Sequence, residues 1–221
     1  MKKIVVIAIA LFSQLTFSQV TKNVGDFDKV TGFDKIEIHL VASNENKVEL
    51  KGKYESEAEL VNNNGELKIR LPFGKFLDGD GLLATVYFKK LEAIEANEGS
   101  FISCEDELKA IDFKLIAKEG SKIVATVTAK KITVISSSGA VIDLSGKTQN
   151  LDIVTNSGGK FEGKECIAQQ VAVSVNAGGY ADVYATDLVN AKTRAGGTIT
   201  IYGKPKQINQ KTVLGGTIKE N

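Results

Sequence analysis

The sequence predicts an all-β protein of the parallel β-solenoid class, a single-stranded β-helix-like stack with coils of about 19 residues. Three observations lead to this prediction. Glycine-centred motifs recur through the second half of the chain, apolar and polar residues alternate on both sides of each glycine, and this alternation keeps its phase from one repeat to the next. An irregular N-terminal β region is expected to cap the stack.

The repeat is marked by seven glycines, which are separated by 21, 19, 19, 20, 18 and 19 residues. They are Gly99, Gly120, Gly139, Gly158, Gly178, Gly196 and Gly215. We expect each glycine to form the corner of a coil, because a corner needs a positive φ or a close approach of stacked backbones, and neither leaves room for a Cβ. The period is not a multiple of six, which argues against a left-handed hexapeptide helix and leaves the hand of the solenoid open.

Residues 1–18 are expected to form a secretory signal peptide. Lys2 and Lys3 precede an apolar run at residues 4–12 that is too short to span a bilayer, and Thr16 and Ser18 are small residues suited to a cleavage site. No cysteine follows the apolar run, so a lipoprotein anchor is not indicated, and no transmembrane segment is expected later. We therefore expect an exported protein of the periplasm, the outer-membrane surface or the extracellular space.

Residues 19–90 are expected to form short strands and a cap that continue into the solenoid. Residues 33–41 alternate, with Ile36, Ile38 and Leu40 on one face, and strands are also expected from Val48, at 66–71 and at 82–88. Residues 55–61 are good helix formers with no β-branched residue before Val61, which favours a helical turn or two. The Asn-Asn-Asn-Gly sequence at 62–65 predicts a tight turn.

Residues 91–221 are expected to form the regular coils. Counted from each glycine, the third and fifth positions are mostly apolar, whereas the fourth is mixed or polar. The third position holds Ile102, Ile123, Ile142, Phe161, Ala181, Ile199 and Ile218. The seventh and fifth positions before a glycine are apolar as well, as at Phe113 and Leu115. Each coil is therefore predicted to be a strand, a corner, a second strand and a short linker.

Charge and cysteine content exclude several classes of protein. The chain of 221 residues has 28 basic and 27 acidic residues, scattered without the basic stripe that nucleic acid requires. Cys104 and Cys166 lie three coils apart, which places them roughly 14 Å apart at the usual strand spacing. A disulfide cannot span that distance, so two separate thiols are expected, with Cys104 in the core.

Three motifs resemble functional sites but favour structural roles. Residues 145–148, Ser-Gly-Lys-Thr, lack the upstream glycine and the following helix of a phosphate-binding loop, and they are expected to form a linker turn. Residues 78–81, Asp-Gly-Asp-Gly, lack the later ligands of a calcium loop and favour a polar turn. His39, the single histidine, is expected on the surface. We expect no catalytic, cofactor-binding or metal-binding residue.

Two outward columns are the candidates for function. The second-position column contains a candidate surface-contact ladder with aromatic residues between lysines. This ladder consists of Phe101, Lys122, Lys160, Tyr180 and Thr198. The fourth-position column stacks Asp143, Glu162 and Asp182 at roughly 5 Å, a separation compatible with a retaining glycosidase, although no aromatic groove accompanies it. At the corners, Ser137, Asn156 and Asn176 are expected to hydrogen-bond along the stack.

Several segments resemble the repeats of the bacterial head GIN domain family, also called auto-transporter adhesins. They are SSSGAVIDLSGK, TNSGGKFEGKE, VNAGGYADVYATDL and RAGGTITIYGKP, and the similarity extends over about residues 30–205 from FDKIEIHL to IYGKP. The resemblance implies an exported, β-solenoid-like envelope protein, and the family supplies no catalytic residues to transfer. At residues 98–100 and 119–121 the chain has Glu-Gly-Ser where SGA or SGS is typical.

We expect an exported, non-enzymatic β-solenoid of the cell envelope that acts as an adhesin or surface-binding scaffold. Its partner would be an unidentified envelope protein or glycan. One alternative is a self-assembling structural envelope protein, a homo-oligomer formed through exposed coil ends, because residues 215–219 end the repeat without a recognisable cap. The other alternative is a small carbohydrate-active enzyme.

Overall fold

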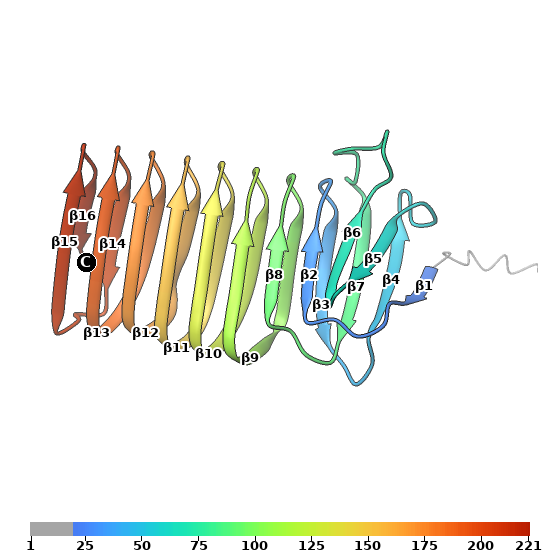
Figure 1. Ribbon diagram of the computed structural model, residues 1–221, viewed down its shortest axis with the longest axis horizontal. Helices are drawn as coiled ribbons and strands as arrows, with labels where there is room; N and C mark the ends of the chain where they lie inside the picture. The colour runs from blue at the N-terminus through green and yellow to red at the C-terminus, as the bar shows by residue number, and fades with distance from the viewer. Residues whose placement is uncertain (1–19) are drawn as a thin grey trace, which may run out of the picture.

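The computed structural model describes residues 20–221, which form one elongated stack of strands (Figure 1). The predicted signal peptide, residues 1–18, lies outside the described residues. Residues 20–221 contain no helix, and hence none that is long and apolar enough to cross a membrane. The predicted parallel β-solenoid is confirmed, since consecutive long strands pair in parallel with a shift of about one coil.

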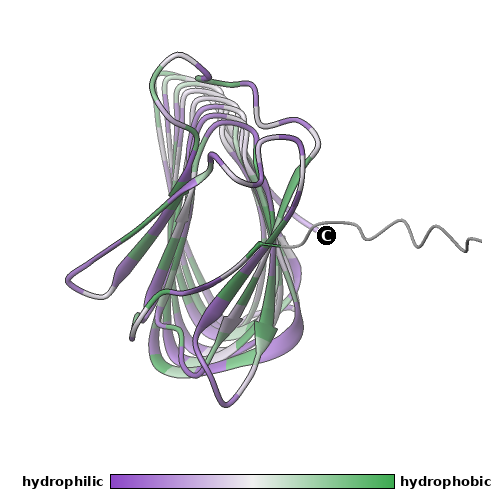
Figure 2. Cartoon of the chain, turned by 90° about the vertical axis from the view of Figure 1, so that its right-hand side faces the viewer, coloured by the Kyte–Doolittle hydropathy of each residue, from purple (hydrophilic) through white to green (hydrophobic). Residues whose placement is uncertain are grey.

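Each coil has two arms that face one another across the core (Figure 2). Wall A contains the residues that follow each corner, and wall B contains those that precede the next corner. Five long strands each bend once and contribute to both walls. They are β9 (Phe101–Ala117), β10 (Lys122–Ser137), β11 (Val141–Asn156), β12 (Lys160–Asn176) and β13 (Tyr180–Arg194). At the C-terminal end, β14 (Thr198–Tyr202) and β16 (Thr217–Glu220) continue wall A, and β15 (Gln207–Val213) continues wall B.

The corners are stacked type I′ turns, which explains the glycine repeat. At residues 137–140, Ser138 and Gly139 have φ values of 53° and 74°, and the Ala140 amide donates to the Ser137 carbonyl oxygen at 3.1 Å. All seven glycines sit at the second central position of such a pair. The Glu98-Gly99 and Glu119-Gly120 corners have the same geometry, so the glutamates do not alter the turn.

The predicted linker between the arms is instead a bend within a continuous strand. Register shifts between neighbouring strands occur at this bend, for example between Asp143 and Gly146 of β11 and between Gly163 and Ile167 of β12. These bulges absorb the differences in coil length while the arms above and below remain in register. Gly146 lies here in the Ser-Gly-Lys-Thr segment, with a φ of 119° and its backbone close to that of Val127. The segment is thus part of β11 and not a loop.

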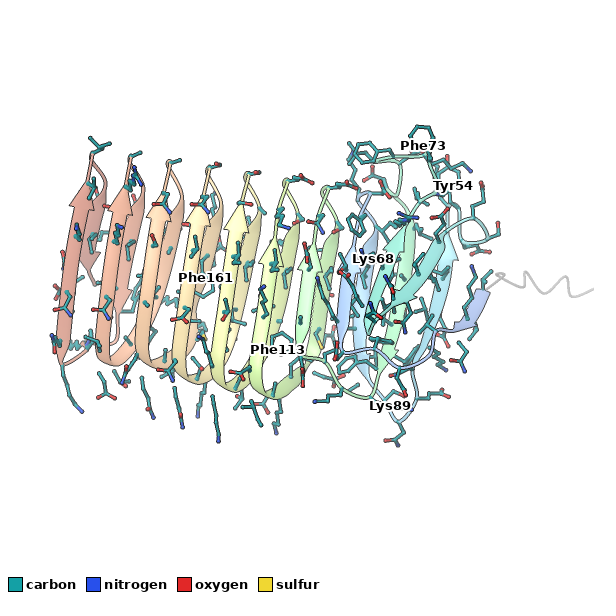
Figure 3. All side chains as sticks on the ribbon, in the orientation of Figure 1. Tyr54, Lys68, Phe73, Lys89, Phe113 and Phe161 are labelled. Atoms are coloured by element: carbon teal, nitrogen blue, oxygen red, sulfur yellow. The ribbon has the colours of Figure 1, made fainter. Side chains whose placement is uncertain are left out.

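The predicted apolar columns form the core. Ile102, Ile123 and Ile142 are completely buried, as are the paired positions of wall B such as Leu115 and Val134. The isoleucine column has a larger side chain at Phe161, which is labelled in Figure 3. Two small residues make room for this ring, namely Ala181 in the next coil and Gly163, two residues further along the same strand. Large and small residues therefore compensate one another along the stack.

The N-terminal cap contains two further coils that lack a marker glycine. β2 (Lys29–Gly32) and β3 (Glu37–Ala42) pair with β8 (Ala93–Ala96) and β9, and their corner is a turn at Asp34 and Lys35 with φ values of 59° and 60°. Beyond them, β6 (Glu66–Arg70) pairs with β2 and β7 (Leu82–Phe88) pairs with β3. Residues 71–81 therefore occupy the place of a corner, and we call them the cap loop.

Antiparallel strands close this end of the stack. β4 (Lys47–Gly52) pairs with β7, β1 (Val20–Asn23) pairs with β4, and β5 (Glu59–Asn63) pairs with β6. The turn predicted at 62–65 joins β5 to β6 through Asn64 and Gly65, both at positive φ. Of the helical turn or two predicted at residues 55–61, a single turn is present, in which the Ala58 amide donates to the Tyr54 carbonyl oxygen at 2.9 Å. From Glu59 on the prediction is wrong, since a strand begins there. Pairing with β6 overrides the helical propensity of this segment.

Both cysteines are free and buried, as predicted for two separate thiols.

At the other end of the stack, the last coil has polar residues at inward positions. Gln210 aligns with Ala191, and Glu220 aligns with Ile201, both of which are buried. The last described coil therefore carries polar residues at inward positions, of the kind that terminal repeats of solenoids need for solubility.

Candidate functional site

The predicted surface-contact ladder is a continuous outward column on wall A. Successive pairs in register join Phe101 to Lys122 and, through Val141, to Lys160, Tyr180 and Thr198. Lys122 and Lys160 are exposed, and the other three residues are partly exposed. The structure thus brings the five residues into one line, and their role in binding stays a prediction.

The carboxylate column lies beside this ladder, two residues further along each strand. Asp143 pairs with Glu162, and Glu162 pairs with Asp182, as the sequence predicts. The Tyr180 hydroxyl donates to Asp182 Oδ1 at 2.6 Å, so one carboxylate of the column is bound to the aromatic ladder residue. None of the three carboxylates lines either of the two clefts described below.

Two further tyrosines near Tyr180 on the same wall, Tyr184 and Tyr202, were missed by the sequence analysis. Three of the five tyrosines of the chain, Tyr180, Tyr184 and Tyr202, lie on the last coils of wall A, where Tyr184 pairs in register with Tyr202. Tyr184 and Tyr202 line a shallow cleft of about 310 Å³, which we call the tyrosine groove. Its remaining lining residues are Lys164, Glu165, Ile167, Gly203, Lys204 and Asn221. These tyrosines occupy the sixth position after the glycine, so extending the column analysis by one position would have found them.

The backbone fixes the position of the Tyr184 ring. Gly203 has a φ of 92°, and a Cβ at this residue would lie 2.5 Å from Tyr184 Cε1 and 2.5 Å from the Ala185 carbonyl oxygen. The ring therefore lies over the Gly203 backbone in the space that any other side chain would fill. Beside it, the ammonium group of Lys164 lies 5.4 Å from the centroid of the Tyr202 ring.

A second candidate surface lies at the cap, where the cap loop overhangs a cleft of about 530 Å³. Half of the residues that line the cleft are apolar, among them Phe33, Leu71, Phe73 and Phe76, and the other half are charged. The charged residues are Asp34, Glu59, Lys68, Arg70 and Glu98. Figure 3 shows Phe73 on the cap loop, at the outer limit of the molecule. Phe73 is fully exposed and Phe76 is 62% exposed.

The cap loop is firmly held despite these exposed rings. The buried Asp34 carboxylate accepts hydrogen bonds from the backbone amides of Leu71 at 2.9 Å and Leu77 at 3.1 Å. On the other side, the Tyr54 hydroxyl donates to Asp78 at 2.6 Å, and the Lys75 ammonium lies 4.1 Å from the Tyr54 ring centroid. The loop conformation is thus fixed, and it presents its phenylalanines to solvent.

Ionisable groups around the cap have shifted pKa values with structural causes. Burial raises the pKa of Glu98, and the nearby negative charges of Asp34 and Glu119 raise it further. Burial alone would raise the pKa of Glu66, but hydrogen bonds from Lys29 and Thr31 outweigh it and lower the pKa from 4.5 to about 2. Lys29 also bonds Glu95 at 2.7 Å, so this network joins neighbouring coils across wall B.

The remaining motifs have structural partners. Asp78 bonds Lys53 at 2.8 Å, and residues 20–221 contain no cluster of histidine, cysteine or acidic residues suited to a metal ion. His39 is confirmed on the surface, 2.8 Å from Glu37. At the corners, Asn176 donates to Asn156 at 2.9 Å, as predicted, whereas the Ser137 side chain makes no such bond within residues 20–221.

These features define a class of protein, the two-walled parallel β-solenoid that presents a flat, in-register outer wall and a capped end. A family model described as "Putative auto-transporter adhesin, head GIN domain" matches residues 26–205. The chain belongs to this family, and the resemblance seen in its repeats is confirmed. A search of curated proteins found no match.

Solved structures share this fold. A "putative adhesin" from Bacteroides fragilis is 19% identical with a TM-score of 0.83, and the alignment covers 92% of this chain and 97% of that one. A "putative adhesin" from Parabacteroides distasonis is 19% identical, with a TM-score of 0.73 and coverage of 92% and 96%. A "putative lipid binding protein" from the same species is 14% identical, with a TM-score of 0.71 and coverage of 91% and 96%. At these identities the likeness shows the fold alone.

Proposed function

We propose that this protein is an exported, non-enzymatic β-solenoid of the cell envelope that binds a surface partner, an envelope protein or a glycan, through the outer face of wall A. The observation that carries the proposal is the ladder of Phe101, Lys122, Lys160, Tyr180 and Thr198, which the register places in one line. A rigid wall with side chains at a fixed spacing suits repeated contacts with an extended partner. The adhesin family supports the same class of function.

The exported location rests on the sequence of residues 1–18, and cell fractionation tests it. We expect the mature protein, which begins at Gln19, in the envelope or extracellular fraction. Retention of the full-length chain in the cytoplasm would contradict this location.

Binding through wall A is tested with purified protein and isolated cell envelopes in a co-sedimentation assay. Charge reversal of two exposed ladder lysines, Lys122→Glu with Lys160→Glu, should weaken binding several-fold. The matched control is Lys114→Glu with Lys192→Glu, which reverses two exposed lysines on wall B. Equal loss in both double variants would show that wall A has no special role, and no binding by the wild type would refute the proposal.

The surroundings of the carboxylate column of Asp143, Glu162 and Asp182 support a non-enzymatic role. Asp182 accepts a hydrogen bond from the Tyr180 hydroxyl, and Asp143, Glu162 and Asp182 lie outside both described clefts, so neither cleft encloses this carboxylate column. A retaining glycosidase needs two carboxyl groups on opposite sides of the bond it cleaves. We expect no release of reducing sugar from bacterial or plant polysaccharides. Hydrolysis that disappears in Glu162→Gln would overturn this part of the proposal.

A second candidate function, lipid binding, is favoured by the cap loop. The exposed rings of Phe73 and Phe76, beside a cleft that is half lined by apolar residues, suit an acyl chain or a bilayer surface. One protein of this fold is described as a "putative lipid binding protein". Co-sedimentation with phosphatidylethanolamine–phosphatidylglycerol vesicles tests it. Phe73→Ser with Phe76→Ser should abolish binding, whereas Ile111→Ser with Leu214→Ser, which removes two exposed apolar residues elsewhere, should retain it.

The self-assembly alternative depends on the unpaired edges of β15 and β16. Each pairs on one side only within residues 20–221, which leaves backbone groups for another strand. The polar residues Gln210 and Glu220 at inward positions oppose apolar stacking of a second copy on this end. Light scattering at rising concentration distinguishes the two cases, since a monomer throughout would exclude assembly.

A further inference from the structure

We infer that the tyrosine groove is a carbohydrate-binding site, which takes one or two pyranose residues of a glycan. This inference rests on the proposed function, because it names a ligand class and a location on the wall A surface. It adds Tyr184, Tyr202, Lys164 and Glu165 to the residues that the ladder contains.

The floor of the groove is aromatic and preorganised. Tyr184 lies over the backbone of Gly203, where no other residue would leave space for the ring, and Tyr202 is its neighbour in register. Both rings are partly exposed. Sugar rings present flat faces of C–H groups, which pack on aromatic faces held in this way, and a ring fixed before binding loses little conformational entropy.

The rim of the groove consists of polar side chains whose hydrogen-bonding groups have no partner within the described residues. Glu165 and Lys204 are exposed and have no ion-pair or hydrogen-bond partner among residues 20–221, and Lys164 has only its contact with the Tyr202 ring. The hydroxyl groups of Tyr184 and Tyr202 are likewise without a hydrogen-bond partner in this part of the chain. Donors and acceptors of both kinds around an aromatic floor match the hydroxyl groups around the edge of a sugar ring.

Size and charge favour a sugar over the other ligands that stack on tyrosine. A volume of about 310 Å³ is at the lower end of the range for small-molecule sites, and the groove is open on the face of a wall, so a chain end or a chain segment can enter. Nucleobases also stack on aromatic rings, but nucleic-acid sites need a positively charged track for the backbone. Here Glu165 lies beside the two lysines, and the chain as a whole has 28 basic and 27 acidic residues.

The test uses a glycan array of neutral and acidic bacterial oligosaccharides, followed by titration calorimetry with the strongest hit. The chain has no tryptophan and five tyrosines, so tyrosine fluorescence provides a second readout of the groove. Tyr202→Ala should weaken binding at least ten-fold, and Tyr202→Phe should retain most of it because the ring remains. Lys164→Ala should weaken binding by a smaller factor.

The matched control is Tyr87→Ala. Tyr87 also lies beneath a lysine, with the Lys47 ammonium 4.5 Å from its ring centroid, but it belongs to β7 in the cap. This variant should bind the glycan as the wild type does. Thermal unfolding of each variant establishes that a loss of binding is not a loss of fold.

The outcomes separate this inference from the proposed function. Envelope binding that needs Tyr202, with no glycan bound on the array, would make the groove a protein contact and overturn the carbohydrate inference alone. Glycan binding that is indifferent to Tyr202→Ala would also overturn it. Absence of both envelope and glycan binding would refute the proposed function together with the inference.

Discussion

Replacing Gly163 by alanine should destabilise the solenoid through one contact in its core. An ideal Cβ at residue 163 would lie 2.2 Å from Cε1 and 2.4 Å from Cζ of Phe161. Phe161 is completely buried, so its ring has no route to solvent. Overpacking of this kind costs about 1–3 kcal/mol of the free energy of unfolding. For a chain of this size, the melting temperature should fall by roughly 2–12 °C.

A double-mutant cycle isolates that contact. Phe161→Leu removes both clashing atoms and leaves a cavity, and it should cost about 1–2 kcal/mol by itself. With both substitutions, the added methyl group occupies part of the cavity, so the double variant should be more stable than the sum of the single effects by about 1 kcal/mol or more. Thermal and urea unfolding, followed by circular dichroism, measure all four proteins. Additive effects, or a Gly163→Ala variant as stable as the wild type, would refute this account of core packing.

The other predictions concern two glycines, one at a corner and one at a bend, a carboxylate of the cap, and the thiols. Gly139→Ala adds a Cβ in open space and should cost about 1 kcal/mol for its positive φ. Gly146→Ala should cost at least about 3 kcal/mol or prevent folding, because its Cβ would also lie 2.1 Å from the Val127 carbonyl oxygen, and urea unfolding compares the two variants. Because the folded-state pKa of Glu66 is lowered from 4.5 to about 2, its stabilising contribution is present above pH 4.5 and is lost as the pH falls toward 2. Melting temperatures of the wild type should therefore fall more steeply than those of Glu66→Gln over this interval, and parallel curves would contradict the prediction. Burial raises the thiol pKa to about 11 for Cys104 and about 12 for Cys166, so Ellman's reagent should react with neither in the native protein and with both in urea.

The sequence predicts the solenoid well because its core is periodic. Alternation around each glycine predicts that Ile102, Ile123 and Phe161 are buried, and all three are. The corner at Asp34 and Lys35 gives no such signal, because both residues adopt a positive φ without a glycine. The propensity of Glu59 and its neighbours favours a helix, and the hairpin pairing of Glu59 with Arg70 in β6 makes it part of a strand. Residue propensities therefore fail where pairing between strands decides the structure.

The sequence predicts some residues of the candidate binding surfaces and not others, depending on whether they follow the repeat. The ladder containing Tyr180 follows from the regular spacing, since its members keep the same position after each corner. Tyr184 meets Ile167 only because a bulge in β12 shifts the register, and a shift of this kind leaves no periodic signal. Phe73 lies in a segment without alternation, and its exposure depends on the buried Asp34, whose carboxylate holds the cap loop at the amides of Leu71 and Leu77. Extending the column analysis by one position would have found Tyr184 and Tyr202, but the alignment of Tyr184 with Ile167 and the cap cleft both require three-dimensional information.

The stacking of the coils has a mechanical consequence when the two ends of the solenoid are pulled apart. The cap and the last coil lie at opposite ends of the stack (Figure 1), so tension between them acts across the hydrogen bonds that join successive coils. Because each coil contacts only its neighbours, we expect this tension to separate one coil at a time. Each coil of 18–21 residues occupies roughly 4.8 Å of the axis when stacked and roughly 65 Å when drawn out. Under tension the stack would lengthen in steps more than ten times the height of a coil, and each step would relieve the load on the coils that remain.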